Sequence, residues 1–227
     1  EESKFGHDYV FMRDSFISDL NGNVLMLKFA EKKREAETEI VANELEKLNF
    51  NLIELPTKKN ILVEGGEFYF CPKDKLLFSG INRNTIAGAE YVASFLNANE
   101  LILIDTPSFH LDTVFTTVFD KQGALSAMIV CEELITKDSF KNLEKVSINL
   151  NVHIINIPAK DSIGTDDYLG SLAVNSFCAP GLLISSSNYS DFSVGKKLES
   201  LGVKTEVCPV SQFQLSGGSV HCLTNEL

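Results

Sequence analysis

The chain has 227 residues and a formal net charge of −11, because 31 Asp and Glu outnumber 20 Lys and Arg. This acid excess argues against a nucleic-acid backbone or an anionic membrane as the main partner, since both attract basic surfaces. Its 44% hydrophobic and 22% charged residues are typical of a globular protein and exclude a disordered chain. No apolar run is long enough to span a membrane, and five widely spaced cysteines indicate free thiols in the cytoplasm.

The hydrophobic pattern predicts the order strand, strand, helix, strand four times along the chain. The first unit is predicted as strands 8–12 and 23–29 around an Asn-Gly turn, a helix over 31–48 and a strand over 50–55. The other three units are predicted over 61–70, 76–79, 84–97 and 100–104; over 112–119, 124–130, 138–147 and 151–157; and over 171–177, 181–185, 189–201 and 203–208. A lone Gly-rich strand is expected over 217–227, and the irregular stretch 156–170 is either a binding loop or a plain connection.

Repeats at a period of about 45–50 residues are typical of propellers and other closed architectures. We therefore predict a single α/β-propeller domain over residues 1–227, with its units arranged around a central channel. An open parallel sheet is the alternative, and the lack of strict strand–helix alternation argues against it. In a closed propeller, loops from different units meet, so distant residues can form one site.

A cysteine follows two glycines in Gly217-Gly218-Ser219-Val220-His221-Cys222. Because glycines allow a ligand to approach the backbone, Cys222 is a candidate nucleophile, with a buried thiol on a last strand as the alternative. Of the four histidines, His110 is the candidate proton carrier, because on a strand it shares a face with Asp112. His221 would point to the opposite face of a strand from Cys222, His7 lies in a terminal stretch, and His153 lies within an alternating strand.

Acidic residues interrupt two other apolar stretches. In Glu64-Gly65-Gly66-Glu67 an acid ends an apolar strand, where burial is costly unless a partner is present. This segment is either part of a site or a hairpin turn with solvated acids. The Arg13-Asp14 pair is either a buried ion pair or a carboxylate that faces the channel. All these signals occupy comparable places in different units.

Together, these motifs resemble those of a known superfamily. Arg13-Asp14, Glu64-Gly65-Gly66-Glu67, Asn82-Arg83-Asn84-Thr85, His110-Leu111-Asp112-Thr113 and the Cys222 motif occur in the order found in the guanidino-group-modifying enzymes. That superfamily includes arginine deiminase, dimethylarginine dimethylaminohydrolase and the amidinotransferases. The resemblance implies a five-bladed α/β propeller (pentein) of strand-strand-helix-strand units, with the fifth blade incomplete in this chain.

The resemblance also implies roles for individual residues. Cys222 corresponds to the nucleophile, His110 to the general acid and base, and Glu64 to the acid that contacts both the histidine and the guanidinium. The substrate-binding positions implied are the carboxylates Asp14 and Asp112, Glu67 where the family usually has Asp, Arg83 for a substrate carboxylate, and Arg34 as a weaker candidate of the same kind.

The resemblance implies a cysteine hydrolase that acts on arginine or an N-omega-methylated arginine through a covalent S-alkylthiouronium. It would release ammonia or an alkylamine and a citrulline-like ureido product, without a metal or organic cofactor. Asp112 favours an unsubstituted guanidinium, whereas the chain length favours the dimethylarginine type. An amidinotransferase and a non-catalytic ligand-binding propeller are the alternatives. The small guanidino substrate is the expected partner, and a homodimer is left open.

Overall fold

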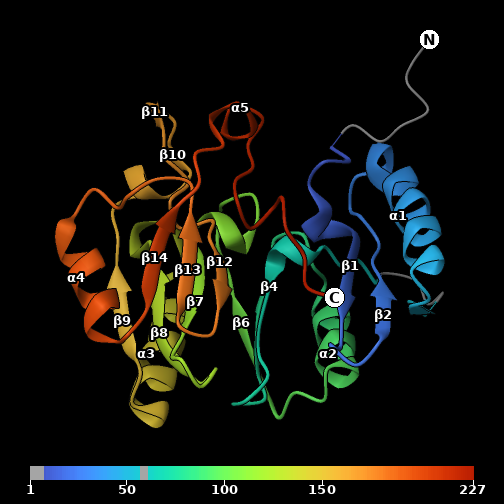
Figure 1. Cartoon of the computed structure of the whole chain (residues 1–227), viewed down its shortest axis with the longest axis horizontal. Helices are drawn as coiled ribbons and strands as arrows, with labels where there is room; N and C mark the ends of the chain where they lie inside the picture. The colour runs from blue at the N-terminus through green and yellow to red at the C-terminus, as the bar shows by residue number, and fades with distance from the viewer. Residues whose placement is uncertain (1–7, 57–60) are drawn as a thin grey trace.

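Four repeated α/β units make up the computed structural model, which describes residues 8–56 and 61–227 (Figure 1). In each unit the first two strands pair antiparallel, and a helix then returns the chain so that the third strand pairs in parallel with the second. A parallel pair needs such a crossover, which explains why a helix lies between the second and third strands. The predicted order of elements is therefore confirmed.

The first unit contains β1 (Phe16–Ser18), β2 (Asn23–Met26), α1 (Glu35–Lys47) and β3 (Asn51–Glu54). The second contains β4 (Phe68–Cys71), β5 (Leu76–Gly80), α2 (Ile86–Phe95) and β6 (Glu100–Ile104). The third contains β7 (Phe115–Phe119), β8 (Leu125–Val130), α3 (Lys137–Leu150) and β9 (His153–Asn156). The fourth contains β12 (Phe177–Ala179), β13 (Leu182–Ser185), α4 (Phe192–Ser200) and β14 (Lys204–Val207).

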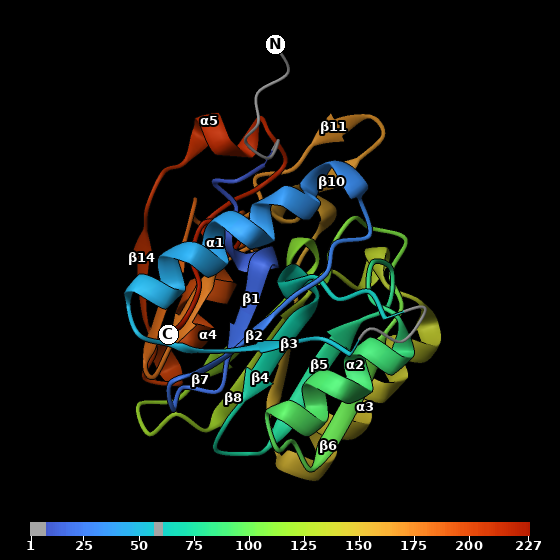
Figure 2. The ribbon, with the colours of Figure 1, turned by 90° about the vertical axis from the view of Figure 1, so that its right-hand side faces the viewer.

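Each of the four long helices packs on its own sheet and lies on the outside of the molecule (Figures 1 and 2). The hydroxyls of Thr85 and Thr136 and the carboxylate of Asp191 accept a backbone N–H from the first turn of α2, α3 and α4. Such side-chain caps define where these helices begin. Within the described ranges, no helix is both long and apolar enough to cross a bilayer.

The predicted first strands need correction. In the first unit no residue of the predicted strand 8–12 lies in a strand, and β1 begins at Phe16; in the other three units the first strand begins later than predicted. Short 3-10 turns replace them in three units: η1 (Met12–Ser15), η3 (Gly65–Glu67) and η4 (Leu111–Thr113). In the fourth unit, residues 171–176 are likewise irregular and the strand begins at Phe177. The physical reason is that a strand would use its N–H groups in the sheet, whereas η3 and η4 each direct one to a buried carboxylate, and in η1 the Arg13 N–H donates to the Cys222 carbonyl.

Two further expectations need correction. Residues 217–227 form turns and no strand, because backbone bonds run locally, from Leu223 N to Ser219 O and from Thr224 N to His221 O. The irregular stretch 156–170 contains a 3-10 turn, η6 (Ala159–Asp161), and a hairpin of β10 (Gly164–Thr165) and β11 (Tyr168–Leu169). A short helix, α5 (Ser211–Gln214), was not expected.

The described residues form an α/β fold of separate three-stranded sheets, one in each unit. These sheets do not close a ring by themselves.

Candidate active site

The turns η1, η3 and η4, which precede the first strands of three units, bring buried charged side chains together. His110, just before η4, faces Glu64 with one ring nitrogen, at 2.6 Å between Nε2 and Oε2. Its other nitrogen lies 3.7 Å from the Asp14 carboxylate of η1. All three residues are at least nine-tenths buried. Residues that are about 50 positions apart in the chain therefore form one cluster.

This setting fixes the charge of His110. Burial opposes a charged imidazole, but the surrounding carboxylates, Asp14 and Glu64 foremost, outweigh it and raise the pKa of His110 to about 10. In turn, burial tends to raise the pKa of Asp14, while His110 and Arg34 hold it below its ordinary value. At neutral pH the cluster therefore holds an imidazolium beside the ionised carboxylate of Asp14.

Gly66 in η3 is required at the centre of this cluster. Its N–H donates to Asp14 Oδ1 at 2.8 Å. A Cβ at this position would lie 2.8 Å from His110 Nδ1, 2.9 Å from Asp14 Oδ1 and 3.2 Å from Asp112 Oδ2. The same small space is thus bordered by all three side chains, and any larger residue would fill it.

Cys222 joins the cluster from the C-terminal turn. Its Sγ lies 3.3 Å from Asp112 Oδ2, and 7% of the residue remains exposed. Burial, followed by the charges of Asp112 and Asp14, raises the pKa of the Cys222 thiol well above its ordinary value. Without a ligand the sulfur is therefore a protonated thiol, and a positive charge placed beside these carboxylates would lower its pKa.

His221 contradicts the sequence-based expectation. Because residues 217–222 form a turn, its side chain is not directed away from the cluster: Nδ1 lies 2.9 Å from Asp112 Oδ2, the oxygen next to the Cys222 sulfur. The ring also stacks on Tyr69, with 4.6 Å between centroids. His153 is exposed on β9, and His7 lies outside the described residues.

Asn175 is a site residue that the sequence analysis missed. Its Nδ2 donates to Cys222 Sγ at 3.1 Å and to the Asp112 carbonyl at 3.1 Å, and its Oδ1 accepts the Cys222 N–H at 3.2 Å. A signal for it was available. Asn175 is a polar residue just before the first strand of the fourth unit, the place that Glu64 and His110 take in their own units.

Glu67 is fully buried and is held by backbone donors. Its oxygens accept the N–H of Arg83 at 2.7 Å and of Leu111 at 2.8 Å. Burial raises the pKa of Glu67, in spite of the opposing charge of His110. This carboxylate therefore links the turn after β5 to η4, which places the Asn82-Arg83-Asn84 motif beside the cluster.

The two candidate arginines differ in their surroundings. Arg34 is buried and pairs with Asp14 at 2.8 Å and with Glu37 at 2.9 Å. Its guanidinium therefore neutralises part of the acid cluster. Arg83 is half-buried, and its guanidinium carbon lies 4.3 Å from the centre of the Phe109 ring, next to His110. Arg83 thus lies at the edge of the cluster, where an anionic group can approach it.

Each of Asp14, Glu64 and His110 offers a possible metal-donor atom, and these three atoms lie within 4.8 Å of one another, which is close enough for a metal site. Their atoms are already engaged: Glu64 with His110 and the Ala30 N–H, and Asp14 with Arg34 and Gly66. A dication would have to displace these partners beside an imidazolium, so the chemistry of this donor set favours an ion-pair network.

One acceptor in the cluster is unused. Asp112 is fully buried, and its Oδ1 has no hydrogen-bond partner among the described residues. A buried carboxylate oxygen without a donor is costly, which points to a donor supplied by a bound molecule.

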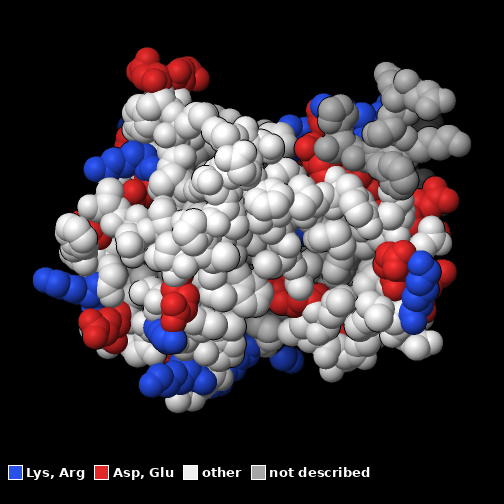
Figure 3. Space-filling model, turned by 45° about the horizontal axis from the view of Figure 1, so that its top comes forward, with Lys and Arg blue, Asp and Glu red and all other residues white. Residues whose placement is uncertain are grey.

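On the outer surface, the face shown in Figure 3 is largely uncharged at its centre, and its described charged side chains lie mostly toward the margin. The acids of the cluster, in contrast, are buried.

Comparison with known proteins identifies relatives of the chain. A family model described as eukaryotic N,N dimethylarginine dimethylhydrolase matches residues 1–227. The bifunctional arginine dihydrolase/ornithine cyclodeaminase ArgZ of Synechocystis sp. is 26% identical over 210 residues, which is 90% of this chain and 27% of ArgZ. The chain thus spans about a quarter of that curated relative.

Solved structures share the fold. AgrE in complex with ornithine and NAD+ has a TM-score of 0.78 at 21% identity, over 97% of this chain and 30% of AgrE. The substrate-bound N-terminal domain of ArgZ has a TM-score of 0.77 at 23% identity, over 95% of this chain and 74% of that one. A dimethylarginine dimethylaminohydrolase adduct has 0.70 at 17% identity, over 97% and 79% of the two chains. The chain therefore belongs to the eukaryotic N,N-dimethylarginine dimethylhydrolase family, within the superfamily of guanidino-modifying pentein enzymes.

Proposed function

We propose that this chain is a cysteine hydrolase of a small cationic guanidino compound, arginine or an N-omega-methylated arginine. The observation that carries the proposal is Asp112, whose Oδ2 lies 3.3 Å from the Cys222 sulfur while its Oδ1 is buried without a partner. A guanidinium offers several N–H donors and a positive charge. It would satisfy Asp112 and at the same time bring its carbon to the sulfur. Family membership and the relation to an arginine dihydrolase support the same substrate class.

Substrate binding would also activate the nucleophile. The charges of Asp112 and Asp14 contribute to the raised pKa of the Cys222 thiol, after burial. A bound guanidinium neutralises these charges, so the thiol pKa falls. The thiolate then forms, and releases its proton to solvent, only when the substrate is present. The free enzyme would therefore be protected from unwanted alkylation or oxidation.

The chemistry would proceed in two halves. The Cys222 thiolate attacks the guanidinium carbon and forms a C–S bond. The His110 imidazolium then protonates the leaving nitrogen, the C–N bond breaks, and ammonia or an alkylamine leaves an S-alkylthiouronium. Neutral His110 next removes a proton from water, whose oxygen attacks the same carbon. The C–S bond breaks, the new hydroxyl gives its proton to the departing sulfur, and the ureido product leaves with the Cys222 thiol restored.

The remaining candidates would bind and orient. Asp14 would contact the guanidinium nitrogens, Glu64 would orient His110, and Glu67 would position the backbone near Arg83. We assign the substrate carboxylate to Arg83, which lies at the edge of the cluster, in preference to Arg34, whose guanidinium pairs with two carboxylates. We further propose that the chain acts as one catalytic domain whose units surround a channel, as parts of a five-bladed propeller.

Incubation of the purified protein with arginine, monomethylarginine, dimethylarginine and agmatine, followed by measurement of ureido product, tests the proposal. Agmatine has no carboxylate, so we expect it to be the poorest substrate if Arg83 binds that group. Cys222→Ser should abolish turnover and leave the circular dichroism spectrum unchanged. Cys208→Ser is the matched control, because Cys208 is exposed and lies outside the cluster.

Absence of ureido product from all four compounds, with Cys222 intact, would contradict the hydrolase assignment. Transfer of the amidino group to added ornithine, without ureido product, would identify an amidinotransferase. Turnover by Cys222→Ser would contradict the covalent route.

A further inference from the structure

His221 precedes the candidate nucleophile in the chain, and the proposed reaction gives it no role. Its side chain is buried, and its Nδ1 lies 2.9 Å from Asp112 Oδ2. The same oxygen lies 3.3 Å from the Cys222 sulfur. One carboxylate oxygen therefore faces both the ring of His221 and the sulfur that is expected to attack the substrate.

The proton on the His221 ring has a defined place. Burial, followed by the charge of Arg13, lowers the pKa of His221, so the ring is neutral at physiological pH. A neutral imidazole carries one N–H, and a carboxylate oxygen can only accept a hydrogen bond. Because Nδ1 lies at hydrogen-bond distance from Asp112 Oδ2, the proton belongs on Nδ1. The ring thus donates to Asp112 and does not act as a base there.

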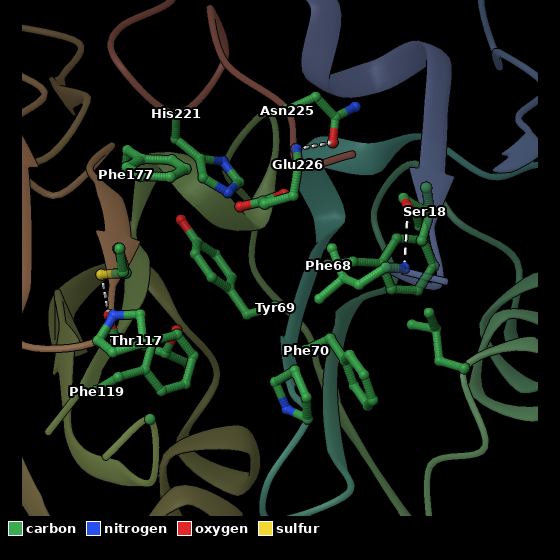
Figure 4. A pocket seen from close by; sticks show the side chains of 18 of the residues that line it. Ser18, Phe68, Tyr69, Phe70, Thr117, Phe119, Phe177, His221, Asn225 and Glu226 are labelled. Atoms are coloured by element: carbon green, nitrogen blue, oxygen red, sulfur yellow. Dashed lines mark hydrogen bonds between the residues drawn. The ribbon is translucent and has the colours of Figure 1, made fainter. Parts of the chain in front are cut away.

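Both the ring and the backbone of His221 are held in place. The ring stacks on Tyr69, with 4.6 Å between centroids and 19° between planes (Figure 4). The His221 N–H donates to the Asn175 carbonyl at 3.2 Å, and the His221 carbonyl accepts Arg13 Nε at 3.4 Å. Contacts to the backbone and to the face of the ring therefore fix the direction in which Nδ1 donates.

The two oxygens of Asp112 have different surroundings. Oδ2 faces the donors of His221 and of the Cys222 thiol, whereas Oδ1 has no partner among the described residues. In the proposed reaction the thiol loses its proton, so the sulfur stops donating and becomes a negative charge beside Oδ2. Of the two donors, the His221 N–H then remains. Without it, repulsion between the thiolate and the carboxylate would turn Asp112 away from the sulfur.

We infer that His221 is a positioning residue, whose Nδ1–H holds Asp112 Oδ2 while the thiol beside it ionises. Oδ1 then stays where the guanidinium binds, with its carbon next to the sulfur. Asn175 holds the sulfur in the same step, so each of the two anions keeps a donor of its own. The inference rests on the proposed function, because there the thiol ionises when a guanidinium binds.

Two substitutions separate the hydrogen bond from packing. In His221→Asn the side-chain Nδ2 can take the place of the ring Nδ1, so the donor stays while the stacking on Tyr69 is lost. In His221→Phe the stacking stays and the donor is lost. His221→Phe should be the more damaging change if the ring acts as a donor, and His221→Asn if the ring only packs. His153→Phe, at an exposed position of β9, is the matched control.

The size of the effect follows from the lost donor. A hydrogen bond to a charged group corresponds to about 10- to 150-fold in rate, so kcat should fall by that factor in His221→Phe. His221→Asn should stay within about fivefold of the wild type, and KM should change less than kcat because the charge of Asp112 remains. Alkylation of Cys222 by iodoacetamide without substrate should follow the same order, because in His221→Phe ionisation of the thiol leaves Oδ2 with neither donor.

Nitrogen NMR of the wild type reports the tautomer of His221, and we expect a protonated Nδ1 and an unprotonated Nε2. Three results would overturn the inference: a proton on Nε2 in place of Nδ1, alkylation of folded His221→Phe as fast as that of the wild type, or alkylation of folded His221→Asn slower than that of His221→Phe. Urea unfolding verifies that both variants fold. The NMR and alkylation measurements need no substrate, so they decide on His221 separately from turnover, whose absence in the wild type would refute the proposed function.

Discussion

Replacement of Asn175 by aspartate tests how the Cys222 sulfur is held. The two side chains have nearly the same size, so access to the sulfur is unchanged. The aspartate can still accept the Cys222 N–H, as Oδ1 of Asn175 does at 3.2 Å, but it loses the donor that lies 3.1 Å from Sγ. We expect the thiol pKa to rise further, because the thiolate loses a hydrogen bond and gains a negative neighbour.

The magnitude follows from that lost bond. A hydrogen bond to a charged group contributes about 1.5–3 kcal/mol, and about 1.4 kcal/mol corresponds to a factor of ten. Alkylation of Cys222 at a fixed pH should therefore slow by about 10- to 150-fold, with a further loss from charge repulsion. The assay is the second-order rate constant with iodoacetamide, followed by mass spectrometry of the peptide that contains Cys222, because Cys208 also reacts.

Asn142→Asp on α3 is the matched control, since it makes the same chemical change and adds the same charge far from the cysteine. Alkylation rates within twofold of the wild type for Asn175→Asp would refute the reasoning. The 3.1 Å contact would then contribute nothing to the state of the sulfur.

Three other predictions follow from the buried charges. Arg34→Met should lower the free energy of unfolding by about 3–5 kcal/mol, because it leaves two buried carboxylates without their charge partner. Adding Glu37→Gln should recover part of the loss. Equal stability of Arg34→Met and the wild type in urea unfolding would contradict this prediction. His110 has a folded pKa of about 10 against an ordinary value of 6.5, so its contribution to stability is complete below pH 6.5 and is lost as the pH rises through 10. His110→Gln should therefore flatten the unfolding free energy between these pH values, and an unchanged pH profile would count against an imidazolium. Asp112→Asn removes a charge beside Cys222, so alkylation without substrate should be about tenfold or more faster, while arginine should bind more weakly; slower alkylation would reverse the assigned effect of that carboxylate.

The repeat and most of the site could be predicted from the sequence, because both rest on local patterns. Alternating apolar residues determine the strands, and acids that interrupt apolar stretches, such as Glu64, are rarely tolerated without a partner. Of the expected positions, Glu64 and Asp14 both lie against His110, and Cys222 lies beside Asp112. Their roles in catalysis stay predictions.

The parts that could not be predicted depend on tertiary contacts. Local alternation continued the strands into η3 and η4, but buried carboxylates take the N–H groups of Gly66 and Leu111 and bend the backbone there. The predicted orientation of the His221 side chain was wrong for a related reason. A strand was assumed around Cys222, and in a strand neighbouring side chains point apart, whereas a turn lets both reach Asp112.

The residues of the charged cluster come from different units, and this has a consequence for folding. Glu64 meets His110, and Cys222 meets Asn175, only after units far apart in the chain have docked. Closing such long loops is slow, and each charge loses water before it gains its partner. The charged cluster should thus be among the last regions to form during refolding and the first to lose order under mild denaturant. Protection of Cys222 against alkylation would then report on the docking of the whole chain, at a stage when far-ultraviolet circular dichroism already shows the helices and strands of the individual units.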